Sequence, residues 1–158
     1  MTATPAAPAR PGRVTGVGHT GITVSDLGRA VGYFRDALGL PVTTPVECRG
    51  ELFEQLTGVA GCVIHICYVS APNHTIELLC YSSPAGQASS TLRPCDNGHL
   101  HLCLDVDDIA AVIAAGRGYG FEPVNPVQVV REGPRRGTKV IYTKGPDNLT
   151  VELREHPR

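Results

Sequence analysis

Apolar and polar residues alternate along eight short stretches of the chain, and this pattern predicts eight β-strands. Successive side chains of a strand point to opposite faces, so a strand with one buried face carries an apolar residue at every second position. The predicted strands cover residues 14–24, 41–47, 62–70 and 75–81 in the first half of the chain and 99–106, 127–130, 138–143 and 149–155 in the second half.

Helical spacing follows the first strand of each half. In the first half, apolar residues recur every three or four positions and form one stripe: Leu27, Val31, Phe34 and Leu38. Ser25 or Asp26 can cap the start of this helix through a side-chain oxygen, and Gly39 ends it. A second helix is predicted at residues 108–115, and a short helical turn at 51–56.

The chain repeats itself once. Four residue types recur at a spacing of 82 positions, in the pairs His19 and His101, Val24 and Val106, Asp26 and Asp108, and Pro41 and Pro123. Later in each half, the segment NHTIEL at residues 73–78 is similar to NLTVEL at 148–153. Each half therefore opens with a histidine-bearing strand and closes with a glutamate-bearing strand. We predict an α+β fold of two βαβββ modules that pool their sheets around one metal-binding cavity.

The length of 158 residues fits one domain made of these two modules. The first module is predicted to span residues 14–82 and the second 98–155, so that the domain covers 14–155. Residues 83–97 are rich in Ser, Pro and Gly and are predicted to link the modules. We expect residues 1–13, mostly Ala, Pro, Thr and Arg, to form a disordered tail.

Composition and charge exclude several classes of function. Fourteen Lys and Arg against fifteen Asp and Glu leave a net charge of −1, so the chain lacks the basic surface that nucleic-acid binding requires. No apolar run approaches the ~18 residues of a membrane span, and the first residues lack the apolar core of a secretory signal. We therefore expect a cytoplasmic protein with no nucleic-acid or membrane partner, whose six cysteines are free thiols.

The duplicated histidines and glutamates all fall on the polar side of their strands. In residues 100–104 the leucines share one face and His101 points to the other, and each glutamate lies opposite its flanking aliphatic residues. Two imidazoles and two carboxylates suit a borderline divalent cation, which offsets the cost of burying the carboxylates. The sequence therefore predicts a metal site formed by His19, Glu77, His101 and Glu152. An octahedral cation with four protein ligands keeps two positions for substrate oxygens.

Four segments make the chain resemble a known superfamily. They are HTGITVSDLGRAVGYFRDALGL from residue 19, HTIELLCY from 74, HLCLDVDDI from 101 and GPDNLTVELRE from 145. They resemble the module signatures of the vicinal oxygen chelate superfamily, which includes glyoxalases, methylmalonyl-CoA epimerases, extradiol dioxygenases and bleomycin-resistance proteins. The resemblance covers about residues 14–155 and implies paired βαβββ modules. It also implies that the same four residues bind nickel, cobalt, manganese, iron or zinc, as two His and two Glu bind the metal of bacterial glyoxalase I.

Two positions depart from glyoxalase I in ways that bear on the substrate. Thr23 stands where that enzyme has an arginine for the glutathione carboxylate, and Tyr81 stands where it has an asparagine. These replacements argue against glutathione, and they make Thr23 and Tyr81 candidates for contacts with a different substrate. Arg135 and Arg136, in a basic loop, are candidates for binding a substrate carboxylate or phosphate.

The expected function is that of a divalent-metal-dependent lyase, isomerase or epimerase of the glyoxalase type. It would act on a small molecule with vicinal oxygens and stabilise an enolate or enediolate. The base would be Glu152 or Glu77, with Glu54 and His65 as further candidates. Two alternatives stay open, an Fe(II)-dependent dioxygenase and a metal-free drug- or metabolite-binding resistance protein. The edge strands of such sheets also favour a homodimer.

Overall fold

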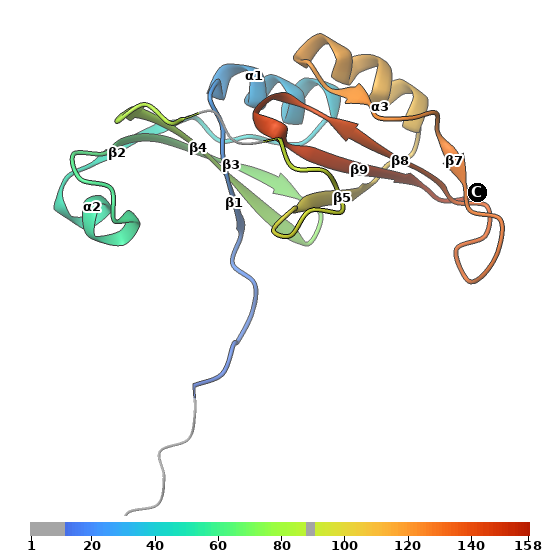
Figure 1. Cartoon of the computed structure of the whole chain (residues 1–158), viewed down its shortest axis with the longest axis horizontal. Helices are drawn as coiled ribbons and strands as arrows, with labels where there is room; N and C mark the ends of the chain where they lie inside the picture. The colour runs from blue at the N-terminus through green and yellow to red at the C-terminus, as the bar shows by residue number, and fades with distance from the viewer. Residues whose placement is uncertain (1–11, 88–90) are drawn as a thin grey trace, which may run out of the picture.

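Each half of the chain forms a module with its own β-sheet (Figure 1). The computed structural model describes residues 12–87 and 91–158. The first eleven residues of the predicted tail, and residues 88–90 of the predicted linker, lie outside the described part of the chain.

The first module contains β1 to β4, and its sheet has the order β1-β4-β3-β2. Its elements are β1 (Thr20–Thr23), α1 (Leu27–Gly32), the π-helical turn η1 (Tyr33–Ala37), β2 (Val46–Arg49), α2 (Glu51–Thr57), β3 (Val63–Ala71) and β4 (His74–Ser83). β1 runs parallel to β4, whereas β4, β3 and β2 pair antiparallel.

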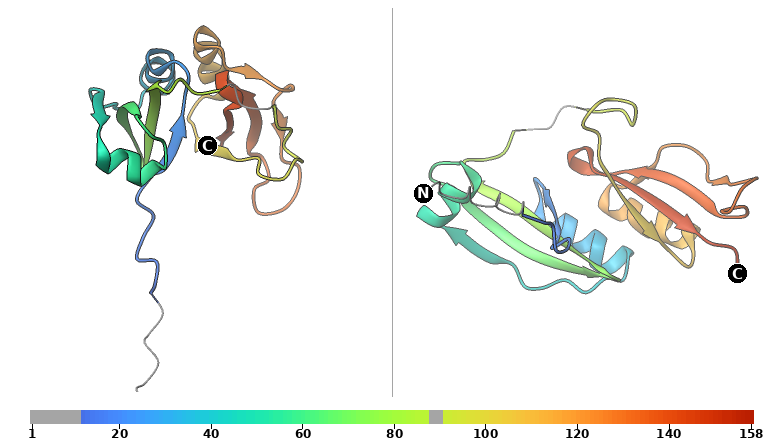
Figure 2. Two further views of the ribbon diagram at one scale, coloured as in Figure 1. Left: turned by 60° about the vertical axis from the view of Figure 1, so that its left-hand side comes forward. Right: turned by 90° about the horizontal axis from the view of Figure 1, so that it is seen from below.

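The second module repeats this arrangement with the order β5-β9-β8-β6, and β7 also pairs with β8. Its elements are β5 (His101–Asp105), α3 (Ile109–Gly116), the 3-10 turn η2 (Arg117–Tyr119), β6 (Glu122–Pro123), β7 (Gln128–Val129), β8 (Lys139–Lys144), the turn η3 (Pro146–Asn148) and β9 (Thr150–Glu155). β5 runs parallel to β9, as β1 does to β4. The predicted α+β fold of two βαβββ modules is therefore confirmed. The two sheets lie side by side (Figure 2).

Aspartate side chains start the helix of each module. Asp26 Oδ1 accepts a hydrogen bond from the Arg29 backbone N–H at 2.9 Å, and Asp108 Oδ1 accepts two from Ala110 and Ala111 at 3.0 Å. These bonds satisfy backbone donors that have no partner within the helix. Among the described residues, no helix has the length and apolar character needed to cross a membrane. All six cysteines are free, as predicted.

α1 and α3 cover the same side of the two sheets, and we call the other side of each sheet its open face (Figures 1 and 2). The predicted apolar stripe of the first helix packs into the core on the helix side. Tyr33 joins it and stacks on Phe121 of the second module, with ring centroids 3.5 Å apart. Both rings are buried, so the two modules share one hydrophobic core.

In the first module, two predicted strands are shorter than expected. The first strand covers only Thr20–Thr23 of the predicted residues 14–24. The second begins at Val46 rather than at residue 41, because Pro41 and Pro45 have no backbone N–H to donate to a neighbouring strand. Between these prolines only Val42 pairs, in an isolated bridge to Val69.

A methyl group at Gly145 is expected to weaken the junction between the modules. A Cβ atom there would overlap the edge of the Phe121 ring, which stacks on Tyr33. Overpacking of this kind costs about 1–3 kcal/mol. We expect Gly145→Ala to lower the free energy of unfolding in urea by that amount. The control is Gly118→Ala, whose added Cβ has no neighbour within 4 Å. Equal stability of the two variants would contradict the prediction.

Candidate functional site

Each module carries one of the predicted His–Glu pairs on the open face of its sheet. His19 Nε2 lies 3.2 Å from Glu77 Oε2, and His101 Nε2 lies 3.0 Å from Glu152 Oε2. The glutamates are mostly buried, with 14% and 17% of their side chains exposed. The histidines are more accessible, so each pair faces solvent through its imidazole.

The parallel strand pairs give both contacts the same register. Glu77 pairs with Gly21, two residues after His19, and Glu152 pairs with Cys103, two residues after His101. Side chains two residues apart in a strand share a face, so each histidine lies beside its glutamate. The predicted duplication therefore extends to the geometry of the pairs.

A tyrosine accompanies each pair, and neither was predicted as part of the site. Tyr68 pairs with Glu77 across β3 and β4, and Tyr142 pairs with Glu152 across β8 and β9. The Tyr68 hydroxyl donates a hydrogen bond to Glu77 Oε1 at 2.8 Å. The Tyr142 ring lies 5.0 Å from the His101 ring, measured between centroids. The sequence carried one signal, a tyrosine nine residues before Glu77 and ten before Glu152.

The donors around the glutamates remain protonated at neutral pH. The hydrogen bond to Glu77 is the main cause that raises the pKa of Tyr68, and burial is the main cause that raises the pKa of Tyr142. Desolvation, followed by the charge of Glu152, raises the pKa of the Cys103 thiol to about 11. Each carboxylate therefore has neutral neighbours that can donate hydrogen bonds, and Cys103 is not a thiolate nucleophile.

The spacing within each pair fits two ligands of one metal ion. Two donor atoms that each lie about 2.1 Å from a cation, at a right angle, are about 3.0 Å apart. The two observed His–Glu distances, 3.2 and 3.0 Å, are close to this value. Imidazole nitrogen with carboxylate oxygen also suits borderline divalent cations. Each pair can therefore serve as half of a metal site.

The four residues do not meet within one chain. Across residues 12–87 and 91–158, no group of three or more His, Cys, Asp or Glu side chains comes close enough to hold a metal ion. His19 and Glu77 belong to one sheet and His101 and Glu152 to the other. The expectation of a single cavity that gathers all four is therefore not met by a single copy of the chain.

A pocket of about 420 Å³ extends along the open face of the first sheet from Glu77 to α2, and we call it the Glu77 pocket. Tyr68 and Glu77 line it together with apolar side chains from three strands and α2. These apolar residues are Val46, Phe53, Leu56, Ile64, Ile66 and Leu79.

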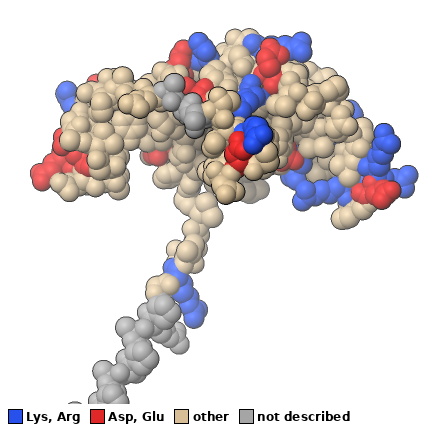
Figure 3. Space-filling model, viewed as in Figure 1, with Lys and Arg blue, Asp and Glu red and all other residues tan. Residues whose placement is uncertain are grey.

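The candidates for substrate contact lie elsewhere. Thr23 and Tyr81 line a separate pocket of about 510 Å³, together with Ser25 and Gln87. Arg135 and Arg136 are exposed in the loop between β7 and β8. This basic loop lies at the opposite end of the molecule from the acidic side chains over α2 (Figure 3).

Neither additional candidate base is brought to a His–Glu pair. His65 pairs with Cys80 and shares a face with Cys67 and Val69, which belong to the core on the helix side. His65 therefore lies on the helix side of the sheet, away from Glu77, and is not placed to act as the base. Glu54 lies in α2, but it is not among the residues that line the Glu77 pocket.

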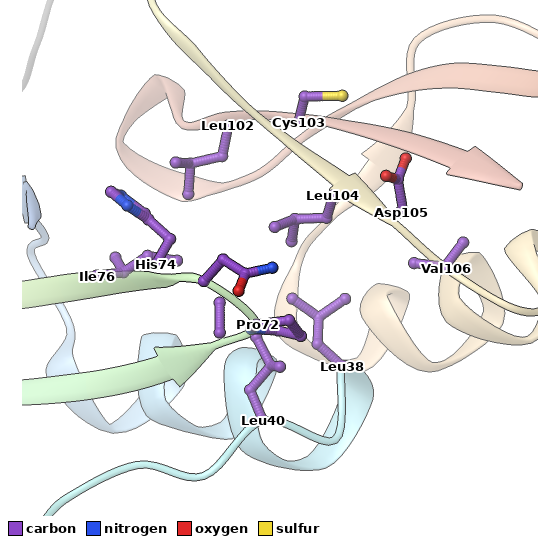
Figure 4. Close-up of a pocket in the computed structure, with 12 residues that line it drawn as sticks. Leu38, Leu40, Pro72, His74, Ile76, Leu102, Cys103, Leu104, Asp105 and Val106 are labelled. Carbon is purple, nitrogen blue, oxygen red and sulfur yellow. The ribbon is translucent and has the colours of Figure 1, made fainter. Parts of the chain in front are cut away.

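A further pocket, of about 330 Å³, separates the hairpin of β3 and β4 from β5 (Figure 4). Leu102 and Leu104 point into it, toward Leu38 and Leu40. None of the four predicted metal ligands lines this pocket. Leu102 and Leu104, which line it, also pack against the core on the helix side.

Comparisons with known proteins agree on the fold and the family. Residues 18–142 match the family described as the glyoxalase/bleomycin resistance protein/dioxygenase superfamily. A 2-epi-5-epi-valiolone epimerase from Actinomyces is 28% identical over 148 residues, which are 90% of this chain and 80% of that protein.

Two solved structures show how widely the fold is shared. A glyoxalase family protein from Bacillus cereus superposes with a TM-score of 0.79 at 22% identity, covering 93% of this chain and 97% of that one. The fosfomycin resistance protein FosX from Listeria monocytogenes, in complex with Mn(II) and sulfate, gives a TM-score of 0.55 at 12% identity. That match covers 92% of this chain and 95% of FosX.

Proposed function

Because the chain belongs to the glyoxalase/bleomycin resistance protein/dioxygenase superfamily, we propose that it is a metal-dependent lyase, isomerase or epimerase. Its substrate is a small molecule with two vicinal oxygens, and its ligands are His19, Glu77, His101 and Glu152. The observation that carries the proposal is the His–Glu pair that recurs in the same register in both modules. The similarity to a protein named as an epimerase supports the isomerase class.

The complete site is proposed to form between two copies of the chain. Each copy offers two half-sites on separate sheets, and within the described residues each sheet ends in an edge strand, β1 or β5, that pairs on one side only. Edge strands are ready to pair with another chain. A symmetric dimer that sets the first module of one copy against the second module of the other makes every such contact twice. It would therefore assemble two equivalent sites.

In the proposed mechanism the protein positions the substrate and moves one proton. A divalent cation bound by the four ligands would polarise a substrate carbonyl and stabilise the negative charge that develops on its oxygen. The carboxylates are the candidate bases, and they differ in their neighbours. Glu77 Oε1 accepts a hydrogen bond from the Tyr68 phenol, whereas Glu152 pairs with Cys103, whose thiol is a weak donor. We therefore assign the proton transfer to Glu152.

The test is exchange of a substrate proton with solvent. The metal-loaded protein would be incubated in D₂O with hydroxyacetone, 2-hydroxyacetophenone and the adduct of methylglyoxal with glutathione, and deuterium at the α-carbon would be followed by NMR. We expect metal-dependent exchange of at least one compound, with a rate at least ~100-fold lower in Glu152→Gln. Glu54→Gln is the control and should exchange like the wild type. Exchange that persists in Glu152→Gln would refute the role of Glu152. Tight binding of these compounds without any exchange would refute the proposed reaction.

A further inference from the structure

We infer that the Glu77 pocket receives an uncharged, apolar part of the substrate. The inference rests on the proposed function, because it names the part of the substrate that lies next to one half of the metal site. It goes further by assigning a chemical class to that part. Substrates with a hydrocarbon chain or an aromatic ring attached to the reacting oxygens would fit, and substrates with an anionic group in that position would not.

The lining of the pocket favours apolar groups. Ile64 and Ile66 of β3, with Leu79 of β4, form its floor, and Phe53 and Leu56 of α2 form its far wall. The two isoleucines are buried in a small cluster of their own, separate from the core under the helices. A volume of about 420 Å³ is also within the usual range of ligand pockets. An apolar group placed there would leave water and contact aliphatic and aromatic side chains.

The charges around the α2 end of the pocket disfavour anions. Among the described residues that line it, Glu77 is the only Asp, Glu, Lys, Arg or His side chain. Glu51 and Glu54 lie in the first turn of α2, so the helix that walls the pocket adds negative charge rather than positive charge. The basic loop with Arg135 and Arg136 lies at the other end of the same copy (Figure 3). At the α2 end of the pocket, away from the proposed cation at Glu77, a carboxylate or phosphate would therefore lie near Glu51 and Glu54 and meet no basic side chain of the described lining residues.

The pocket is continuous with the half-site. Glu77 faces His19 through Oε2 and accepts the Tyr68 hydrogen bond through Oε1, and both Glu77 and Tyr68 also line the pocket. A substrate whose oxygens lie beside His19 and Glu77 would therefore extend its remaining atoms over Leu79 and Ile66 toward α2. Leu56 is 75% exposed on this wall, so it can contact a ligand without moving.

The test compares two fluorescent probes that share one skeleton. N-phenyl-1-naphthylamine is neutral, and 8-anilino-1-naphthalenesulfonate is the same molecule with a sulfonate. We expect the full-length protein to bind the neutral probe at least ~10-fold more tightly. Leu56→Lys places a cation on the pocket wall and should reverse this preference. The matched control is Leu52→Lys on the same helix, since Leu52 is 72% exposed and does not line the pocket.

Three results would overturn the inference. The first is a sulfonated probe that binds as tightly as the neutral one, and the second is a Leu56→Lys variant that behaves like Leu52→Lys. The third is failure of the wild type to bind either probe while Leu56→Lys, unlike Leu52→Lys, dissociates the dimer in sedimentation. That third result would show that a second copy fills the pocket.

The probe titrations are run on metal-free and Mn(II)-loaded protein, and Mn(II) binding is measured separately. Selective probe binding without any metal binding would refute the proposed function alone. Metal binding without probe selectivity would refute the inference alone.

Discussion

Two variants that each lose their metal are expected to regain it when they are combined. One variant carries His19→Ala with Glu77→Gln, and the other carries His101→Ala with Glu152→Gln. Because each site is proposed to take one pair from each copy, a mixed dimer has one site with all four ligands and one site with none. Random mixing makes half of the dimers mixed, so Mn(II) capacity should recover to about one quarter of the wild-type value. Equilibrium dialysis after unfolding and refolding the two variants together measures this capacity.

The controls for this experiment are the two variants refolded separately, which should remain empty. Two different affinity tags without histidine allow the mixed dimers to be isolated, and their capacity should be one ion per dimer. Mixed dimers that form but bind no Mn(II) would contradict a site shared between copies. Substantial Mn(II) binding by either variant alone would contradict the ligand assignment.

Metal binding is expected to stabilise the wild type strongly and His101→Ala hardly at all. A ligand at 100 times its Kd adds about 2.7 kcal/mol to the free energy of unfolding, which raises the Tm of a chain of this size by roughly 5–11 °C. Loss of one ligand should weaken the affinity at least ~100-fold, since even residues that only support ligands commonly contribute 10–100-fold. At the same Mn(II) concentration, the variant would then gain only about 0.4 kcal/mol.

The control is His156→Ala, which removes an exposed histidine that pairs with Asp105 and belongs to neither His–Glu pair. Its Tm should rise with Mn(II) as much as that of the wild type, and a chelator should reverse the rise. An equal rise in His101→Ala would contradict the role of His101 as a ligand. These measurements need no substrate.

Local patterns in the sequence predicted most of the fold and the pairing within each half of the site. The alternation in residues 100–104 puts His101 opposite Leu102 and Leu104, and the structure places those leucines against the core. Asp26 was one of the two predicted caps of the first helix, with Ser25, and Asp108 caps the second helix from the equivalent position of the repeat. The repeat also indicated that each histidine belongs with the glutamate of its own module, because both modules carry the two residue types at corresponding positions.

Local patterns in the sequence could not predict the orientation of His65 or the distance between the two His–Glu pairs. The face of His65 could not be predicted because the residues on both sides of it are apolar. Ile64 and Ile66 line the Glu77 pocket on the open face, while Cys67 belongs to the core on the helix side. A strand with two apolar faces has no alternation to interpret. The distance between the two half-sites depends on how the modules pack, through contacts such as Tyr33 with Phe121, and no local pattern encodes it.

In the proposed dimer, the separation of the two His–Glu pairs within each chain would couple metal uptake to association. Within the described residues, a lone copy presents two donors at each half-site, so it would hold a cation far more weakly than the proposed pair of copies. In a shared site, bound metal stabilises the dimer, and dilution of the protein releases metal as the copies part. The apparent metal affinity of such a protein then depends on its own concentration, and a dilute assay reports the dissociation of subunits as well as the chemistry.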